Sequence, residues 1–118
     1  MSLHSNVRID LGERSYDILI GSGLLDAAAT WHGLPRAAAA LIVSNTTVAP
    51  LYGQRLRAAL APHYPQVSLI ELPDGEAHKD WASLDQIFDA LLAGGFDRRT
   101  VLFALGGGVV GDITGFAA

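Results

Sequence analysis

The feature that most constrains the fold is a run of three glycines that directly follows a short apolar segment. Thr100–Leu105 is apolar after its first residue, and Gly106, Gly107 and Gly108 follow it without a break. Small residues at a helical spacing then continue to the end of the sequence. This order predicts a buried strand, a tight turn and the beginning of a helix. Such a junction presents bare backbone N–H groups and the positive end of a helix dipole, which suit an anion.

Composition indicates a globular chain with a substantial core. Half of the 118 residues are hydrophobic and 17% are charged, and this length fits one domain. The net charge of −4, with both signs interspersed, argues against a broad nucleic-acid surface. The absence of cysteine excludes thiolate nucleophiles and zinc–thiolate sites, and the four histidines form no metal-ligand pair at helical spacing. Without a membrane-length apolar run or a targeting pattern, we expect a cytoplasmic protein.

The chain begins with the pattern of a β-hairpin. Val7–Leu11 and Tyr16–Ile20 alternate apolar and polar residues, and Gly12–Ser15 connects them. Ser22 is expected to cap a short helix over Leu24–Ala29. The later elements, in chain order, are a strand at 38–44, a helix with the apolar positions Leu51, Tyr52, Leu56, Ala59 and Leu60, a strand at 67–72, a helix with the apolar positions Trp81, Leu84, Ile87, Phe88, Leu91 and Leu92, and the strand at 100–105.

Strands that alternate with helices over such short distances must be parallel and joined by crossovers. The sequence therefore predicts an α/β fold with a Rossmann-like, mostly parallel sheet and an N-terminal β-hairpin. Because no repeat and no linker interrupts this order, we expect residues 1–118 to contain no domain boundary.

The glycine turn also satisfies a dinucleotide-binding pattern. Gly106, Gly108 and Gly111 match G-x-G-x-x-G, in which glycine lets the backbone approach a pyrophosphate, although the pattern here follows the last strand rather than the first. A structural explanation is also open, because Gly108, Gly111 and Gly115 form a seam along which a helix could pack tightly on a sheet. Asp112, expected in the first helical turn, either interacts with the dipole or faces an uncharged or cationic part of a ligand, such as a nicotinamide.

A second polar cluster, Asp74-Gly75-Glu76-Ala77-His78-Lys79, follows another predicted strand. Both junctions fall at the carboxyl edge of a parallel sheet, where ligands bind. One interpretation is a solvated turn in which Asp74 caps the next helix, and the other is a ribose contact by Glu76 with charge pairing by Lys79. Asn45, at the end of a third strand, could reach the same ligand, although an N-cap role explains it equally well.

Three segments together resemble the 3-dehydroquinate synthase family of sugar-phosphate cyclases. They are Leu72-Pro73-Asp74-Gly75-Glu76 with Lys79, the glycine-rich stretch from Leu105 to Ala117, and Val43–Tyr52. The resemblance implies a dehydroquinate synthase-like N-terminal domain that binds NAD. By motif match, the implied NAD contacts are Asn45, Asp74, Gly75, Glu76, Ala77, His78, Lys79, Gly107, Gly108, Val109, Val110, Gly111 and Asp112, with Asp112 on the nicotinamide side.

The resemblance further implies an enzyme of the shikimate pathway, which converts 3-deoxy-D-arabino-heptulosonate 7-phosphate to 3-dehydroquinate and phosphate. In that family NAD transiently oxidises a substrate hydroxyl so that phosphate leaves by β-elimination, and a divalent metal, zinc or cobalt, polarises the hydroxyl. A second, helical domain carries the metal ligands and most substrate contacts. No part of that domain is present here, so we expect an N-terminal fragment that has no catalytic or metal-binding residues and is inactive alone. The full-length enzyme is expected to be a homodimer that binds neither nucleic acid nor a membrane.

Two other functions fit the same residues. One is an NAD-dependent polyol or glycerol-phosphate dehydrogenase of the same superfamily, which would accumulate NADH where a synthase returns its hydride. The other is a non-catalytic module that binds a nucleotide or phosphate.

Overall fold

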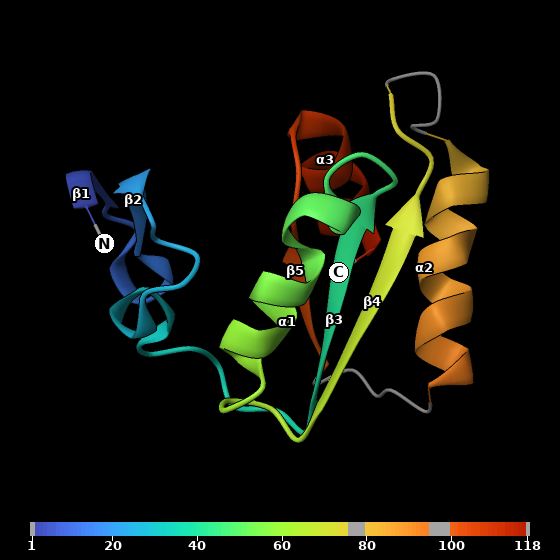
Figure 1. Ribbon diagram of the computed structural model, residues 1–118, viewed down its shortest axis with the longest axis horizontal. Coiled ribbons are helices and arrows are strands. Elements are labelled where there is room, and N and C mark those ends of the chain that lie inside the picture. The colour runs from blue at the N-terminus through green and yellow to red at the C-terminus, as the bar shows by residue number, and fades with distance from the viewer. Residues whose placement is uncertain (1, 76–79, 95–99, 118) are drawn as a thin grey trace. The chain divides into compact units, whose positions relative to one another are not determined.

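The computed structural model describes residues 2–75, 80–94 and 100–117 and divides into two compact units, Met1–His32 and Gly33–Ala118. The smaller, hairpin unit contains a two-stranded sheet, and the larger, sheet unit contains a three-stranded sheet in the order β4-β3-β5 (Figure 1). The predicted α/β class, parallel sheet and N-terminal hairpin are confirmed. The expectation of a chain without an internal domain boundary stays a prediction.

The hairpin unit pairs β1 (Ser2–Ile9) with β2 (Tyr16–Ser22) in antiparallel orientation. The last pair of the register is Ile9 with Tyr16, so β1 ends two residues before the predicted end at Leu11. The prediction extended the strand too far because the polar residue Asp10 fits the alternating pattern, whereas its carboxylate bonds to residues of the connection between the strands.

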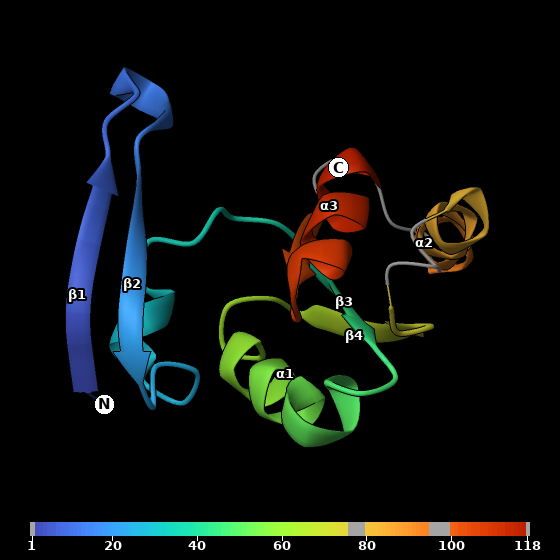
Figure 2. The ribbon, with the colours of Figure 1, turned by 90° about the horizontal axis from the view of Figure 1, so that it is seen from above.

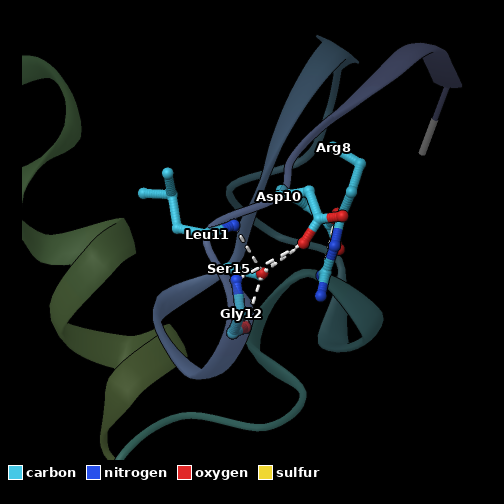
Figure 3. Close-up of polar contacts among 6 residues, drawn as sticks. Arg8, Asp10, Leu11, Gly12 and Ser15 are labelled. Carbon is cyan, nitrogen blue, oxygen red and sulfur yellow. Dashed lines mark hydrogen bonds and ion pairs between the residues drawn. The ribbon is translucent and has the colours of Figure 1, made fainter.

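Asp10 begins the connection between the two strands, as Figure 3 shows. Its carboxylate accepts a hydrogen bond from the Gly12 N–H at 3.4 Å and lies 3.2 Å from the Ser15 hydroxyl. The Ser15 hydroxyl accepts from the Leu11 N–H at 2.8 Å and donates to the Gly12 carbonyl at 2.6 Å. Because Gly12 has a positive φ of 68°, this tight connection favours glycine at that position.

The predicted helix over Leu24–Ala29 is wrong. The only helical residues there belong to a short 3₁₀ helix at Ala28–Trp31. Ser22 is the last residue of β2 rather than a helix cap. The Trp31 indole N–H donates to the Leu25 carbonyl at 3.0 Å, and this contact favours the turn over a regular helix.

The sheet unit is built around β3 (Ala39–Asn45), in which every residue is buried. Parallel strands flank it on both sides, namely β4 (Gln66–Leu72) and β5 (Val101–Ala104). The short apolar run at 38–44 is thus the strand buried on both faces that it predicts. The predicted strands at 67–72 and 100–105 are confirmed to within one residue at each end.

Helices cover both faces of this sheet. A π-helical segment, Ala49–Gly53, leads into α1 (Gln54–Leu60) on one face, and α2 (Trp81–Ala93) and α3 (Gly108–Ala117) cover the other (Figure 2). The core between the sheet, α2 and α3 consists of Leu41, Val43, Leu72, Leu84, Ile87, Val110 and Ile113. Among the described residues, no helix has the length and apolar character that a membrane span requires.

The apolar face predicted before α1 is only partly right. Leu56 and Leu60 are buried, but Leu51 and Tyr52 are 63% and 42% exposed. Both exposed residues lie in the π-helical segment, where the residues per turn differ from the 3.6 that the prediction assumed.

The apolar face predicted for α2 is also only partly right. Leu84 and Ile87 are buried in the middle of the helix, whereas Trp81 and Leu92, near its two ends, are 71% and 80% exposed. Helical periodicity assigns a residue to a face but does not say how far along the helix the sheet extends.

Candidate functional site

The carboxyl ends of the three parallel strands meet at one edge of the sheet, with β3 in the middle. The chain leaves β3 towards α1 on one face and leaves its neighbour β5 towards α3 on the other face (Figure 2). In open α/β sheets, the place where neighbouring strands diverge in this way is where ligands bind. The candidate site is therefore the edge formed by the ends of β3 and β5, with the loop after β4 on the other side of β3.

Ser44 connects the end of β3 to the residue that precedes the glycine turn. Its side chain is fully buried, and its hydroxyl donates a hydrogen bond to the Leu105 carbonyl at 2.8 Å. The Leu105 N–H donates to the Val43 carbonyl at 2.9 Å. The two bonds hold both sides of Leu105 against the central strand.

Asn45, the next residue, connects β3 to the loop after β4. Its amide oxygen accepts hydrogen bonds from the N–H groups of Thr47 and Val48, at 3.1 and 2.7 Å, in the turn before the π-helical segment. The N-cap of that segment is Val48, so the expected N-cap role of Asn45 is wrong. Its amide nitrogen donates to Asp74 Oδ1 at 3.2 Å. The Thr47 hydroxyl donates to the other oxygen of Asp74 at 2.6 Å. Asp74 thus joins two strand-end loops, and both atoms of the Asn45 amide are engaged.

The interpretation in which Asp74 caps the next helix is wrong. Asp80 caps α2 instead, because its carboxylate accepts from the Ser83 N–H at 3.0 Å. Gly75 has a φ of +108°, a conformation that favours glycine, so the turn after Asp74 has a structural need for this residue. Glu76, Ala77, His78 and Lys79, the other predicted contacts of this cluster, lie outside the described residues.

Gly106 is the glycine that the turn itself requires. Its φ is +154°, and a Cβ built on it would lie 3.0 Å from Val110 Cγ2. A side chain here would meet both backbone strain and a contact with the first turns of α3. Gly106 is therefore explained by the fold.

The glycines that follow are not explained by packing. A Cβ built on Gly107, Gly108 or Gly111 would meet no heavy atom within 4 Å among the described residues, and the same holds for Gly115. All four are exposed, while α3 packs on the sheet through its opposite side, at Val110 and Ile113. The explanation of the glycine seam as a close contact between helix and sheet is therefore wrong, and the seam leaves bare backbone on the open side of α3.

Asp112 lies further along α3 than expected. The helix begins at Gly108 and has no acidic residue in its first turn, so the explanation of Asp112 by the helix dipole is wrong. The residue lines a cavity of about 540 Å³ between the beginning of α2 and α3, whose lining is Asp80, Trp81, Leu84, Asp112, Ile113 and Phe116. The rings of Trp81 and Phe116 meet edge to face at 6.0 Å, so Asp112 has apolar surroundings on one side.

The structure thus brings Asn45 and Asp74 into direct contact and places Gly107–Asp112 at the neighbouring strand end. Sequence reasoning missed the bond of Ser44, which it placed only as the last residue of a predicted strand, and the bond from Thr47 to Asp74. A hydroxyl residue at the carboxyl end of a central apolar strand is the feature that could have indicated Ser44. Nothing local indicates its partner, which is 61 residues away.

Residues 69–118 match the model of the family described as 3-dehydroquinate synthase N-terminal. The matched part runs from within β4, through α2 and β5, to the end of α3. It therefore contains both the Asp74 turn and the glycine turn.

Three solved structures are similar to nearly the whole chain. A 2-deoxy-scyllo-inosose synthase complexed with carbaglucose-6-phosphate, NAD+ and Co2+ matches 97% of it with a TM-score of 0.82 and 21% identity, over 31% of that protein's own chain. A second structure of a 2-deoxy-scyllo-inosose synthase matches 97% with a TM-score of 0.81 and 22% identity, over 32% of its chain. At these identities the two structures establish the fold.

The third structure is closer in sequence. A 2-epi-5-epi-valiolone synthase from Streptomyces hygroscopicus subsp. jinggangensis 5008, with NAD+ and Zn2+ bound, is 36% identical over 93% of this chain, with a TM-score of 0.68. The match covers 30% of that protein, so the chain spans about a third of the length of the structures it resembles. Residues 69–118 therefore match the N-terminal region of the 3-dehydroquinate synthase family, and the chain has the fold of the N-terminal part of these sugar-phosphate cyclase structures.

Proposed function

We propose that this chain is the NAD-binding part of a sugar-phosphate cyclase, and that the protein is a 3-dehydroquinate synthase. The family model with that description supports the specific activity, and the NAD+ bound in two similar structures supports the cofactor. The reaction would be the conversion of 3-deoxy-D-arabino-heptulosonate 7-phosphate to 3-dehydroquinate and phosphate.

The observation that carries the proposal is the bare backbone after β5. Gly107, Gly108 and Gly111 have open space where a side chain would be, at the strand edge where α/β proteins bind ligands. The first N–H groups of α3 have no acceptor within the helix, so they are available to a pyrophosphate. The residues present therefore fit NAD.

The other residues at this edge would position the cofactor rather than react. Asp74, held by Asn45 and Thr47, would fix the beginning of the connection after β4. From the sequence we assign a ribose contact to Glu76 and charge pairing to Lys79. Asp112 would contact the nicotinamide side, next to the apolar lining of the cavity. When bound, NAD supplies the reversible oxidation of a substrate hydroxyl.

A divalent metal has no assigned residues in this chain. In the parts of the chain that the structure describes, no group of three or more His, Cys, Asp or Glu side chains could hold a metal ion. The Co2+ and Zn2+ of the similar structures are properties of those proteins, and we assign no step at this site to a metal.

A second cyclase activity is favoured by one observation. The 36% identity to a 2-epi-5-epi-valiolone synthase extends over 93% of the chain, whereas the family model covers only residues 69–118. Both activities would use the same NAD-binding edge. Only the substrate and the cyclic product would differ.

Because this chain alone is expected to be inactive, the test is turnover by the purified full-length enzyme that contains it, with NAD, a divalent metal and 3-deoxy-D-arabino-heptulosonate 7-phosphate. We expect 3-dehydroquinate and inorganic phosphate in equal amounts, without a rise in the absorbance of NADH. Accumulation of NADH would instead indicate a dehydrogenase. If the enzyme binds NAD but releases no phosphate from this substrate, the result would favour the 2-epi-5-epi-valiolone synthase activity.

A further inference from the structure

The last two residues of β3 each connect to a different candidate loop. Asn45 bonds to Asp74 in the loop after β4, and Ser44 bonds to Leu105 at the glycine turn after β5. Asn45 was predicted to contact NAD from its sequence position, whereas Ser44 is fully buried and cannot touch a ligand. Its hydroxyl instead bonds to the Leu105 carbonyl, directly before the glycine turn that is proposed to contact the ligand.

The position of the bond makes it important for the turn. The backbone pairing of β3 with β5 ends at Val43 and Ala104, and the Leu105 N–H makes one more bond, to the Val43 carbonyl. The next peptide unit, between Leu105 and Gly106, leaves the sheet. Its carbonyl is the group that accepts the Ser44 hydroxyl at 2.8 Å.

This peptide unit controls the direction of the chain into α3. Gly106 has a φ of +154°, and a Cβ built on it would lie 3.0 Å from Val110 Cγ2, so the turn passes close to α3 at this residue. Beyond it, a Cβ built on Gly107 or Gly108 would meet no heavy atom of another described segment within 4 Å. The orientation of their N–H groups therefore depends on how firmly the preceding peptide is held.

We propose that Ser44 is a positioning residue, which fixes the peptide between Leu105 and Gly106 and thereby orients the N–H groups of Gly107 and Gly108 for a pyrophosphate. This inference rests on the proposed NAD site. A buried serine that only satisfied its own hydroxyl would change stability when removed, but would not change the turn or the cofactor affinity.

Tyr64 provides a matched control. Its side chain is 2% exposed, and its hydroxyl donates to the Pro35 carbonyl at the same 2.8 Å distance. Tyr64 precedes β4 at the amino edge of the sheet, and its ring packs edge to face on Phe103 of β5, a contact that Tyr64→Phe keeps. Tyr64→Phe and Ser44→Ala each remove one bond from a buried hydroxyl to a carbonyl oxygen, and only the second is next to the turn.

The experiment compares these two variants with the wild-type protein in three measurements: urea denaturation, amide hydrogen exchange, and calorimetric titration with NAD. We expect both variants to lose a similar, modest amount of stability. Only Ser44→Ala should exchange faster at residues 105–108 and bind NAD roughly tenfold more weakly, the effect of one lost hydrogen bond. Tyr64→Phe should keep wild-type exchange in the turn and an affinity within about twofold of wild type.

The result that would overturn the inference is Ser44→Ala with wild-type exchange at 105–108, or with an NAD affinity no weaker than that of Tyr64→Phe. If the wild-type protein itself does not bind NAD, the proposed function fails and the cofactor half of the inference fails with it. The exchange comparison then still decides whether Ser44 fixes the turn, because it needs no ligand.

Discussion

Asn45 donates a hydrogen bond to Asp74 across two adjacent strand ends, at 3.2 Å from Nδ2 to Oδ1. The two residues are 29 positions apart in the sequence, and each was expected to contact NAD on its own. In the structure they contact each other, and Thr47 completes the arrangement. A role for either one in binding therefore includes holding the other loop in place.

The first prediction concerns this pair. Asp74→Ala should lower the free energy of unfolding by about 1 kcal/mol, because Asp74 is exposed and its bonds compete with water. Asn45→Ala should cost more, about 2 kcal/mol, because it also removes the acceptor for Thr47 and Val48. Urea denaturation of both single variants and the double variant measures the coupling, which we expect to be at least about 0.5 kcal/mol. Additive effects would show that the contact contributes nothing.

The second prediction separates a glycine that the fold needs from one that it does not. Gly106→Ala should lower the free energy of unfolding by about 1–3 kcal/mol, because of its φ of +154° and the nearby Val110 side chain. Gly111→Ala, inside α3 with no atom near the new methyl, should leave stability unchanged or raise it by about 0.5–1 kcal/mol. Thermal or urea denaturation checks both. A clear loss in Gly111→Ala would mean that α3 packs against something on its open side.

The third prediction concerns the beginning of α2. Asp80→Ala should cost about 1 kcal/mol of stability, because the Ser83 N–H loses its acceptor at the helix N-terminus. Asp80→Ser should keep most of that stability, since serine is also a good cap. Denaturation of the two variants in parallel is sufficient. Equal losses in both would indicate that the charge of Asp80, rather than the cap, contributes the stability.

The fourth prediction is a dependence on alkaline pH. Burial raises the pKa of Tyr64 above its ordinary value of 10.0, because the charged phenolate would lose its hydration. A pKa that is higher in the folded state means that the stabilising contribution is complete below pH 10.0 and is lost as the pH rises through the folded-state pKa. Urea midpoints measured from about pH 9 to about pH 11 should fall more steeply for wild type than for Tyr64→Phe. Parallel curves would contradict the raised pKa.

The strands could be predicted because each is a short apolar run between turn residues, and β3 is the clearest case. The glycine turn could be placed for the same reason, since Gly106 follows β5 after a single residue, Leu105. The helix expected over Leu24–Ala29 could not be corrected from the sequence, because the side-chain bond from Trp31 competes with the local helical pattern. The prediction that Trp81 and Leu92 are buried was wrong. Periodicity shows which face of a helix a residue is on, but not how far along the helix the sheet covers that face.

The positions of Asn45 and Asp74 at strand ends could be predicted, but their connections could not, and their contact with NAD stays a prediction. Asp74 and Asn45 were identified by their positions at strand ends, which is a local property. The bonds from Asn45 to Asp74 and from Ser44 to Leu105 depend on which strands become neighbours in the sheet. The strand order β4-β3-β5 puts both loops next to β3, and no local pattern in the sequence contains that order.

The central claim is that the bare backbone after β5 binds the pyrophosphate of NAD, and calorimetric titration of Gly108→Val beside the wild-type protein tests it most directly. A Cβ built at this position meets no heavy atom within 4 Å among the described residues, so there is room for the side chain to begin and we expect the variant to fold, which urea denaturation checks. We predict saturable NAD binding by the wild type and none by the variant. No heat from the wild-type protein at millimolar NAD, or equal binding by the variant, would contradict the claim.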